Sequence, residues 1–427
     1  MKPGNNFHKA WLWVPTLYFL QGIPYIIVNN VSVVFYKRMG LSNSEIAFYT
    51  SWLYLPWVLK PLWSPIVDLI KTKHQWIVVL QIAISCSLGL LGFFIPASFW
   101  FQISLCLFWI VAFSSSTHDI AADGFYMLSL DENQQSFFVG IRSTFYRIAM
   151  ITGQGVMIMI AGTFESSSAI GSKVTAEAWA TTFYLAALLF ALITLYHTMF
   201  LPYSKKDISK SINFKQLKNE FLKTFQAFFK KTGILWALLF LLIYRFGEAQ
   251  LLKIAPLFLM DKRSVGGLEL TTEKVGFVFG TVGVISLIIG GVSGGIAVSK
   301  KGLKYWLWWM FLAINIPHLL YLLLAIYQPS NFIIINICAA IEQFGYGFGF
   351  TAYMIFMLYL AEGEYKTVHY SLCTGFMALS MMIPGLFSGK LQELIGYKMF
   401  FGWILLAMIP GIWILRKVSL ERDFGKN

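Results

Sequence analysis

Several ionisable side chains lie within or directly after long apolar stretches of this chain. Asp119 and Asp123 follow the run FQISLCLFWIVAF without an intervening proline or turn cluster. They are four residues apart, so a helix places both on one face. Two adjacent carboxyl groups resist being ionised together, and one of them could therefore carry a proton. Asp123 could instead form a salt bridge with a loop at the helix end.

Basic side chains are close to this carboxyl pair in the sequence. His118 lies about 100° around the helix from Asp119, and both a substrate contact and a hydrogen-bonded packing role remain open for it. Arg147, in STFYRIAM, has apolar neighbours on both sides. It is suited to pair with Asp119 or Asp123, or to hold a carboxylate or phosphate with two hydrogen bonds. Arg142 is nearer the loop, and we interpret it as a gate or interfacial charge.

The second half of the chain carries a further set of buried polar residues. Arg245 and Glu248 are three residues apart and can neutralise one another on one helical face. If the pair can separate, it could couple ligand binding to proton movement; if it is static, it only lowers the cost of insertion. Glu342 is a lone carboxylate in AAIEQFGYGFGFTAY, and we predict that it carries a proton. Gln343 beside it is a candidate substrate contact.

Two local patterns accompany these residues. Glycines 345, 347 and 349 follow Glu342 and permit close helix approach or bending. A Gly-x-Gly-x-Gly within an apolar span is weak evidence for nucleotide binding, because that fingerprint belongs between a strand and a helix. Asp68, in LKPLWSPIVDLIKTKHQW, precedes basic residues between two apolar runs. We interpret Asp68 as part of a cytoplasmic gate.

The composition indicates what kind of element positions these residues. The chain is 57% hydrophobic and only 12% charged, whereas soluble domains average about 25% charged residues. Apolar stretches of about 20 residues recur, which is the length that crosses a bilayer as a helix. The expected spans are 11–35, 45–66, 76–95, 101–127, 137–162, 178–201, 233–259, 272–298, 305–327, 332–360, 370–390 and 399–415.

The distribution of Lys and Arg predicts the orientation of these spans. With the N-terminus inside, the cytoplasmic segments hold 21 of the 33 basic residues and the outer loops hold 6. This bias places both termini in the cytoplasm. It also accounts for the net charge of +13, so the charge gives no reason to expect binding to nucleic acid.

The predicted spans divide into two halves of six. We expect an N-terminal half at 1–201, a cytoplasmic and partly amphipathic linker at 202–232, and a C-terminal half at 233–427. The segment FYMLSLDENQQSFFVGIRSTF after the fourth span aligns loosely with YMIFMLYLAEGEYKTVHYSLCTGF after the tenth. Two parallel six-helix repeats around a central cavity describe the major facilitator architecture.

Other classes of function are disfavoured. The four cysteines fall inside apolar runs at no metal-ligand spacing, so we expect neither a metal site nor a disulfide framework. The chain shows no nucleophile–base motif and no soluble domain, which argues against a membrane enzyme or sensor. We expect no cofactor other than a proton gradient, and a monomer in contact with membrane lipid.

Five motifs together resemble the AmpG family of muropeptide permeases, within the major facilitator superfamily. LKPLWSPIVDL is similar to that family's Phe/Leu-Lys-x-Leu-Trp-x-Pro-x-x-Asp pattern. STHDIAADGF resembles its Thr-Gln-Asp-Ile/Val-x-x-Asp-Ala element, with His118 in place of Gln. YRIAM matches Tyr-Arg-x-Gly-Met with Ala149 for Gly, YRFGEA resembles Tyr-Lys-x-Gly-Asp-Ala, and IEQFGYGFGFTAY resembles Phe-Glu-Asn-x-x-x-Gly-x-Gly-x-Ala.

The resemblance implies a proton-driven importer of anhydro-muropeptides in the inner membrane, working by alternating access in cell-wall recycling. It places six charged side chains in the translocation pathway, namely Asp119, Asp123, Arg147, Arg245, Glu248 and Glu342. Related branches of the family carry siderophores or acetyl-CoA, and these stay as alternatives. The departures at His118 and at the Arg245–Glu248 pair could change the choice of substrate.

Overall fold

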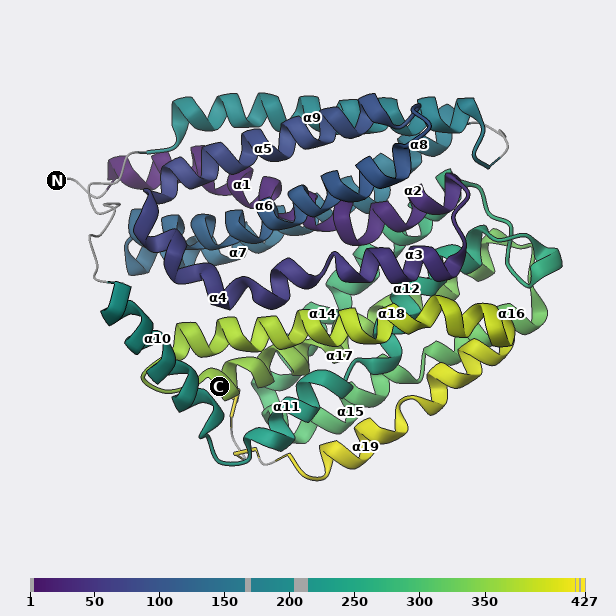
Figure 1. The fold of residues 1–427 in the computed structure, drawn as a ribbon. Coiled ribbons are helices and arrows are strands. Elements are labelled where there is room, and N and C mark those ends of the chain that lie inside the picture. The colour runs from purple at the N-terminus through teal and green to yellow at the C-terminus, as the bar shows by residue number, and fades with distance from the viewer. Residues whose placement is uncertain (1–3, 166–169, 203–213, 419, 422–423, 427) are drawn as a thin grey trace. The chain divides into compact units, whose positions relative to one another are not determined.

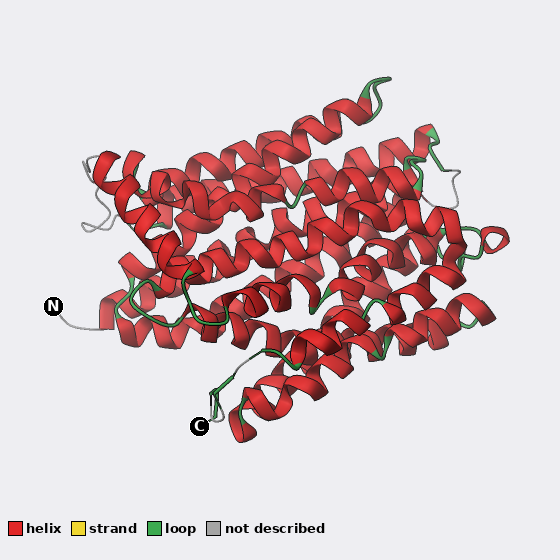
Figure 2. Ribbon diagram, turned by 60° about the horizontal axis from the view of Figure 1, so that its bottom comes forward, coloured by secondary structure: helices red, strands yellow, loops and turns green. Residues whose placement is uncertain are grey.

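The computed structural model describes residues 4–165, 170–202, 214–418, 420–421 and 424–426. Within these ranges the chain consists of helices joined by turns and loops, and no strand occurs among them (Figure 2). The predicted all-α class is therefore confirmed.

Ten helical stretches of the described chain are long and apolar enough to cross a membrane. They differ from the twelve predicted spans at two places. The predicted span 45–66 consists of two shorter helices separated at Leu53–Tyr54. The predicted spans 370–390 and 399–415 both fall within Lys366–Leu415, which is interrupted where Gly396 adopts a φ of 72°.

The helices form two compact units. Unit 1 comprises Met1–Met39 and Leu62–Asn213, and unit 2 comprises Gly40–Pro61 and Phe214–Asn427. The chain therefore enters unit 2 early, for the length of about one span, and then returns to unit 1.

Unit 1 is a bundle in which α5 lies against α6 and α9, and α1 against α7 and α6 (Figure 1). Its core holds buried aromatic side chains, among them Trp13, Phe125 and Phe138. Its helices are α1 Gly4–Ile26, η1 Ile27–Val31, α2 Ser32–Arg38, α5 Lys73–Phe94, α6 Trp100–Ser129, α7 Glu132–Met150, η2 Ile151–Met157, α8 Ile158–Glu165 and α9 Lys173–Phe200, while α4 Leu55–Ile70 is shared with unit 2.

Unit 2 is a bundle in which α17 packs against α14 and α15, while α18 packs against α3, α12 and α16. Tyr244, Phe311 and Tyr353 lie in its core. Its helices are α3 Asn43–Trp52, α10 Phe214–Phe229, α11 Ile234–Ile243, α12 Phe246–Met260, η3 Arg263–Val265, α13 Thr272–Gly276, η4 Phe277–Gly283, α14 Val284–Lys301, α15 Leu303–Asn315, α16 His318–Tyr327, α17 Phe332–Ala361, α18 Lys366–Leu406 and α19 Ile409–Leu415.

Short polar signals fix where several of these helices begin. Ser42, Thr72 and Asp131 precede α3, α5 and α7, and each accepts a hydrogen bond from the backbone N–H three residues later. The side chain of that later residue accepts a hydrogen bond from the backbone N–H of the cap, which completes a capping box. These caps therefore fix the residue at which each of the three helices begins.

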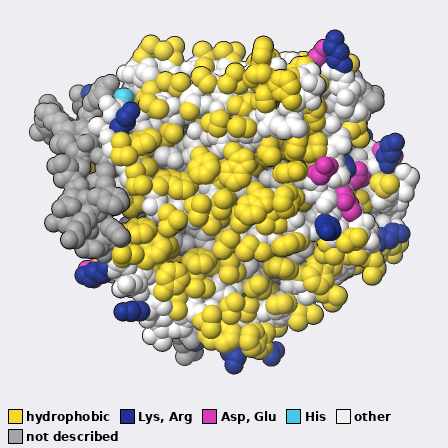
Figure 3. Space-filling model, in the orientation of Figure 1, with side chains coloured by type: hydrophobic (Ala, Val, Ile, Leu, Met, Phe, Trp, Pro, Cys, Tyr) yellow, Lys and Arg dark blue, Asp and Glu magenta, His cyan; other side chains and the backbone are white. Residues whose placement is uncertain are grey.

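The outer surface of the helices is largely apolar. Large hydrophobic side chains are exposed along the helices of both units, including Leu192 and Met199 on α9, Val292 on α14 and Phe387 on α18. Figure 3 shows hydrophobic side chains over most of the face that it presents, with charged side chains near its edges. Such a surface is expected of helices that face lipid.

Candidate functional site

Two long helical stretches of unit 2 are interrupted part-way along their length. Between α11 and α12, Arg245 leaves helical geometry with a φ of −109° and a ψ of 19°. Between α15 and α16 the chain turns at Ile316–Pro317, because a proline cannot donate the backbone hydrogen bond that would continue the helix. Broken helices of this kind direct polar side chains into the interior of membrane proteins.

The two breaks bring a carboxylate and an imidazole together. His318 Nε2 lies 2.9 Å from Glu248 Oε2, and both side chains are fully buried. Gly247 beside Glu248 lets α18 approach α12, since a Cβ atom added there would lie 3.2 Å from the Ile404 carbonyl oxygen. The pair therefore links the start of α12 to the start of α16.

A second buried carboxylate belongs to the same cluster. Glu342 of α17 interacts electrostatically with both Glu248 and His318, and Gln343 Nε2 donates a hydrogen bond to its Oε2 atom at 3.0 Å. Within the described chain, Glu342 Oε1 and Glu248 Oε1 receive no hydrogen bond, and the buried Tyr321 hydroxyl beside them makes none. We call Glu248, His318, Tyr321 and Glu342 the carboxylate cluster.

Arg245 supplies a positive charge next to this cluster. Its Nη2 atom donates to the Tyr346 hydroxyl at 2.6 Å, and its guanidinium carbon lies 4.5 Å from the centroid of the Phe350 ring. Its charge also acts on Glu248. The helix break turns Arg245 toward the aromatic rings of α17, and its pairing with Glu248 stays a prediction.

The net charge of Arg245 and the carboxylate cluster is zero when the cluster holds one exchangeable proton. Arg245 and ionised Glu248 cancel, so Glu342 and His318 are jointly neutral only if one proton is shared between them. Loss of that proton would leave a net negative charge in a buried site, which is costly without a compensating cation. A single proton shared within the cluster avoids that cost.

In unit 1, Asp123 pairs with Arg142 and not with Arg147. Arg142 Nη2 lies 3.1 Å from Asp123 Oδ1, and the Tyr18 hydroxyl donates to the same oxygen at 3.1 Å. The guanidinium also lies 4.4 Å from the centroid of the Tyr18 ring. The Asp123 side chain is 38% exposed and the Arg142 side chain 31%, so this pair is reachable from outside the unit.

His118 is a buried member of a polar network that joins four helices. Gln81 Nε2 lies 3.0 Å from His118 Nε2, and Gln81 Oε1 lies 2.9 Å from His197 Nδ1. His197 Nε2 continues the network to Thr16 Oγ1 at 2.9 Å. The hydrogen-bonded packing role left open from the sequence matches this geometry.

The other predicted site residues, Asp119, Arg147 and Asp68, lie on α6, α7 and α4. Asp119 on α6 and Arg147 on α7 are half-buried, and each takes part in an interaction. The backbone of Asp68 belongs to α4, but its side chain lies outside the described residues.

Sequence reasoning missed His318, Tyr321 and Lys253 as site residues. Lys253 lies off the Arg245–Glu248 face of α12, and it is nevertheless buried, at 2% exposure. One signal for His318 was available, because it directly follows Pro317 within an apolar run. A histidine at a helix break is placed where a broken helix exposes polar groups.

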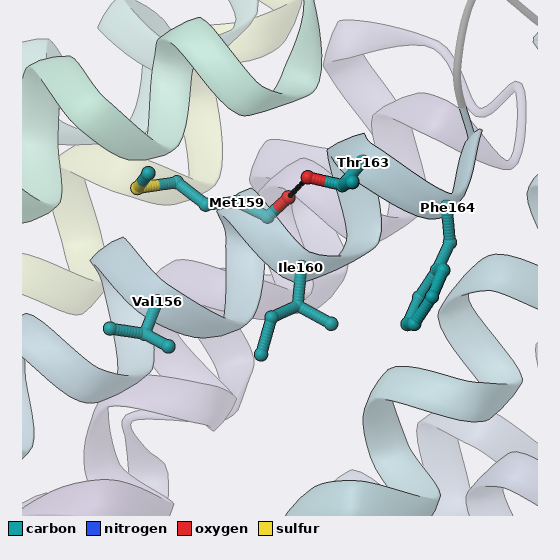
Figure 4. A pocket seen from close by; sticks show the side chains of 5 residues that line it. All are labelled: Val156, Met159, Ile160, Thr163 and Phe164. Carbon is teal, nitrogen blue, oxygen red and sulfur yellow. Dashed lines mark hydrogen bonds between the residues drawn. The ribbon is translucent and has the colours of Figure 1, made fainter.

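The structure also has an apolar hollow away from these charges. Val156, Met159, Ile160, Thr163 and Phe164 line a cavity of about 310 Å³ on η2 and α8 (Figure 4). The Thr163 hydroxyl already donates to the Met159 carbonyl at 2.9 Å, while Val156 and Phe164 are 45% and 49% exposed. The hollow therefore has the character of a lipid-facing surface.

Long apolar helices with buried charges at helix breaks define a polytopic transport protein. Residues 16–383 match the family model of the Major Facilitator Superfamily, and the chain belongs to this family of transporters. It is a multi-pass protein of the inner membrane and not an enzyme.

The curated relatives confirm the predicted AmpG-like character. The chain is 25% identical over 420 residues to "Putative transporter AmpG 4" of Rickettsia conorii, with 94% of each chain covered. It is 22% identical over 419 residues to "Anhydromuropeptide permease" of Escherichia coli K12, with 93% of this chain and 77% of that protein covered.

Solved structures support the major facilitator fold. The D-xylose–proton symporter aligns with a TM-score of 0.72 at 12% identity and covers 99% of this chain and 98% of its own. The nucleoside transporter NupG aligns with a TM-score of 0.69 at 14% identity, with 98% of this chain and 100% of its own covered.

Proposed function

We propose that this transporter imports anhydro-muropeptides into the cytoplasm by alternating access and that protons drive the import. The substrate class rests on the AmpG-like relatives, of which one is named an anhydromuropeptide permease. Such ligands carry peptide carboxylates and sugar hydroxyls. They require cations and hydrogen-bond donors or acceptors along the pathway.

The observation that carries proton coupling is the carboxylate cluster. Glu248 and Glu342 are fully buried beside a histidine that can share their proton. Buried ionisable groups in spans are expensive and normally mark ion or substrate pathways. Asp119 and Asp123 are the corresponding proton sites of unit 1.

The other polar residues have binding and gating roles in this proposal. Arg147 and Arg245 bind substrate carboxylates, because a guanidinium presents two parallel donors. Gln343 contacts uncharged polar groups of the substrate, while His118 holds α6 against α5 through Gln81. Asp68 and Arg142 form part of the cytoplasmic gate. No cofactor other than the proton gradient is required, and the monomer is the working unit.

Twelve spans with both termini in the cytoplasm complete the proposal. The two extra crossings are residues 45–66, which α3 and α4 cover together, and the division of Lys366–Leu415 at Gly396. The excess of Lys and Arg in the proposed cytoplasmic segments supports this orientation.

Uptake by the purified protein in proteoliposomes tests substrate and coupling together. We expect labelled anhydro-muropeptide to accumulate when the outside is acidic and to stop accumulating when an uncoupler collapses the gradient. Ferric siderophore and acetyl-CoA are included as competing substrates. Accumulation of either one in place of the muropeptide would overturn the substrate assignment, and accumulation that ignores the uncoupler would overturn proton coupling.

Glu342→Gln separates coupling from translocation. The amide keeps the size of the side chain but cannot release a proton, so gradient-driven accumulation should fall at least about tenfold. Exchange of substrate across the bilayer without a gradient should persist. Glu177→Gln is the control, because the Glu177 side chain is 58% exposed and pairs with the exposed Lys173. Equal loss of accumulation and exchange in Glu342→Gln would assign Glu342 a structural role.

A further inference from the structure

Lys253 of α12 is a buried cation that the carboxylate cluster does not use. Its side chain is 2% exposed. Its ammonium donates to Thr50 Oγ1 at 2.9 Å and lies 5.2 Å from the centroid of the Tyr54 ring. Both partners are electrically neutral. Among the residues that the structure describes, no carboxylate lies within ion-pair distance of this ammonium.

Packing alone does not explain a lysine at this position. Burial of an ammonium without an opposite charge is strongly unfavourable. A methionine has a similar length and would fill the same space without that cost. An amine at this position therefore indicates a role beyond filling space.

Two hydroxyl groups, those of Thr50 and Ser51, lie on the helix beside Lys253. Thr50 donates its own hydrogen to the Ile46 carbonyl at 2.6 Å, so it faces Lys253 as an acceptor. The Ser51 hydroxyl is fully buried and has no hydrogen-bond partner within the described residues. It lies against Gly385, where an added Cβ would overlap Ser51 Oγ and lie 3.4 Å from Lys253 Cγ. An ammonium and a free hydroxyl beside one glycine are suited to bind a carboxylate.

The helix that covers Lys253, α3, is short and is not continuous with α4. α3 ends at Trp52, and non-helical residues divide it from α4. It meets α18 across glycines, because a Cβ added at Gly389 would overlap the Asn43 carbonyl oxygen. The Asn43 amide donates to Gln392 at 2.7 Å, to Tyr397 at 2.9 Å and to Asp261 at 3.1 Å, and the Ser44 backbone N–H donates to Glu393 at 2.9 Å. These hydrogen bonds and the close backbone contact are what must break if α3 moves away from α18.

We propose that Lys253 and Ser51 form a binding site for a carboxylate of the transported compound, which Thr50 masks until α3 withdraws. The inference rests on the proposed function only in taking the substrate to be an acid. The carboxylate replaces the Thr50 oxygen at the ammonium. Binding thereby stabilises the state in which α3 has left α12, and this links recognition of the acid to opening.

Charge-selective labelling tests the site without any substrate. Ser51→Cys is placed in a background whose native cysteines, Cys86, Cys106, Cys338 and Cys373, are replaced by alanine. Negatively and positively charged thiosulfonate reagents of equal size are then compared in proteoliposomes. The measured quantity is the ratio of the reaction rate of the anionic reagent to that of the cationic reagent. This ratio should be about tenfold higher in Ser51→Cys, which keeps Lys253, than in the matched Ser51→Cys/Lys253→Met variant. Equal ratios in the two variants, or no reaction with either reagent, would overturn the proposal.

Ligand binding provides a second and independent measurement. The wild-type protein, Lys253→Met and Lys253→Arg are titrated with an anhydro-muropeptide and with the same compound after amidation of its carboxyl groups. Lys253→Met should weaken binding of the acid at least about tenfold and change the affinity for the amidated compound by no more than about twofold. Lys253→Arg should retain most of the preference for the acid over the amide. Equal weakening of both ligands would assign Lys253 a structural role and overturn the proposal.

The two measurements separate this inference from the proposed function. If wild-type protein binds neither form of the muropeptide, the proposed substrate is wrong, and the labelling ratio alone decides whether Lys253 serves an anion site. If the muropeptide binds and Lys253→Met keeps the full preference for the acid, the carboxylate site is wrong while the proposed substrate stands.

Discussion

At the scale of single residues, the buried charges of this protein differ in how completely they are satisfied. Glu165 in unit 1 accepts from Arg38 Nε at 2.8 Å and from Trp179 Nε1 at 2.6 Å, so both of its oxygens are engaged. In unit 2, one oxygen of Glu248 and one of Glu342 are left without a hydrogen bond among the described residues. Full satisfaction indicates a structural role, whereas incomplete satisfaction leaves room for protons or ligands.

Glu165→Ala should therefore destabilise the protein without a direct effect on coupling. Its side chain is 1% exposed, and removal of one partner from a buried ion pair costs about 3 kcal/mol or more. The detergent-solubilised protein is heated to a series of temperatures. Size-exclusion chromatography then measures the fraction that stays monodisperse, which gives the midpoint of thermal unfolding. Glu177→Ala is the matched control, because an exposed pair on a helix surface contributes little. Equal midpoints for the two variants would contradict a structural role for Glu165.

At the scale of elements, glycines set how closely the helices of unit 2 approach each other. The close approach predicted for the glycine series after Glu342 is confirmed. A Cβ added at Gly347 would overlap the Leu287 carbonyl oxygen of α14, and one added at Gly345 would overlap the Ala313 carbonyl oxygen of α15. These contacts hold α17 against the helices on both sides and thereby fix Glu342 beside the two helix breaks.

Gly347→Ala should lower stability by about 1–3 kcal/mol, since the added methyl group meets backbone atoms that cannot move away independently. The control is Gly295→Ala on α14, where an added Cβ meets nothing within 4 Å. That control should be neutral or slightly stabilising, because alanine favours a helix more than glycine does. Thermal unfolding of both variants checks this prediction, and a Gly347→Ala midpoint at or above that of the control would refute it.

At the scale of the whole molecule, the chain combines an apolar helical surface with basic residues concentrated in alternate loops. Membrane insertion responds to Lys and Arg in short loops near the span ends. The proposed linker, 202–232, holds eight of these residues, and it is the strongest single determinant of orientation. The orientation in turn decides which ends of the helices open to the cytoplasm.

Reporter fusions test this orientation. Alkaline phosphatase, which is active only outside the cytoplasm, should be active when it is fused after Gly266 and inactive after Lys231 or after the final residue. Green fluorescent protein at the same positions should give the opposite pattern. Activity of the phosphatase at the C-terminus would reverse the assignment of inside and outside, and with it the direction of transport.

The sequence by itself determined the class of the protein and most of its helices. Apolar stretches long enough to cross a bilayer leave few alternatives, because backbone groups in lipid must be satisfied within helices. It also indicated Glu248 and Glu342, since charges inside apolar runs are rare. It could not divide 45–66 into α3 and α4, because such an interruption depends on packing rather than on composition.

Only the tertiary structure decided which buried groups meet. His318 is 70 residues from Glu248 in the chain, yet the breaks at Arg245 and Pro317 bring their side chains to 2.9 Å. Asp123 selected Arg142 over Arg147, and Lys253 was covered by Thr50, which is 203 residues away. Helical periodicity predicts which residues share a face of one helix. Contacts between helices depend on where each helix breaks and on which glycines let it approach its neighbours, and these are properties of the assembled bundle.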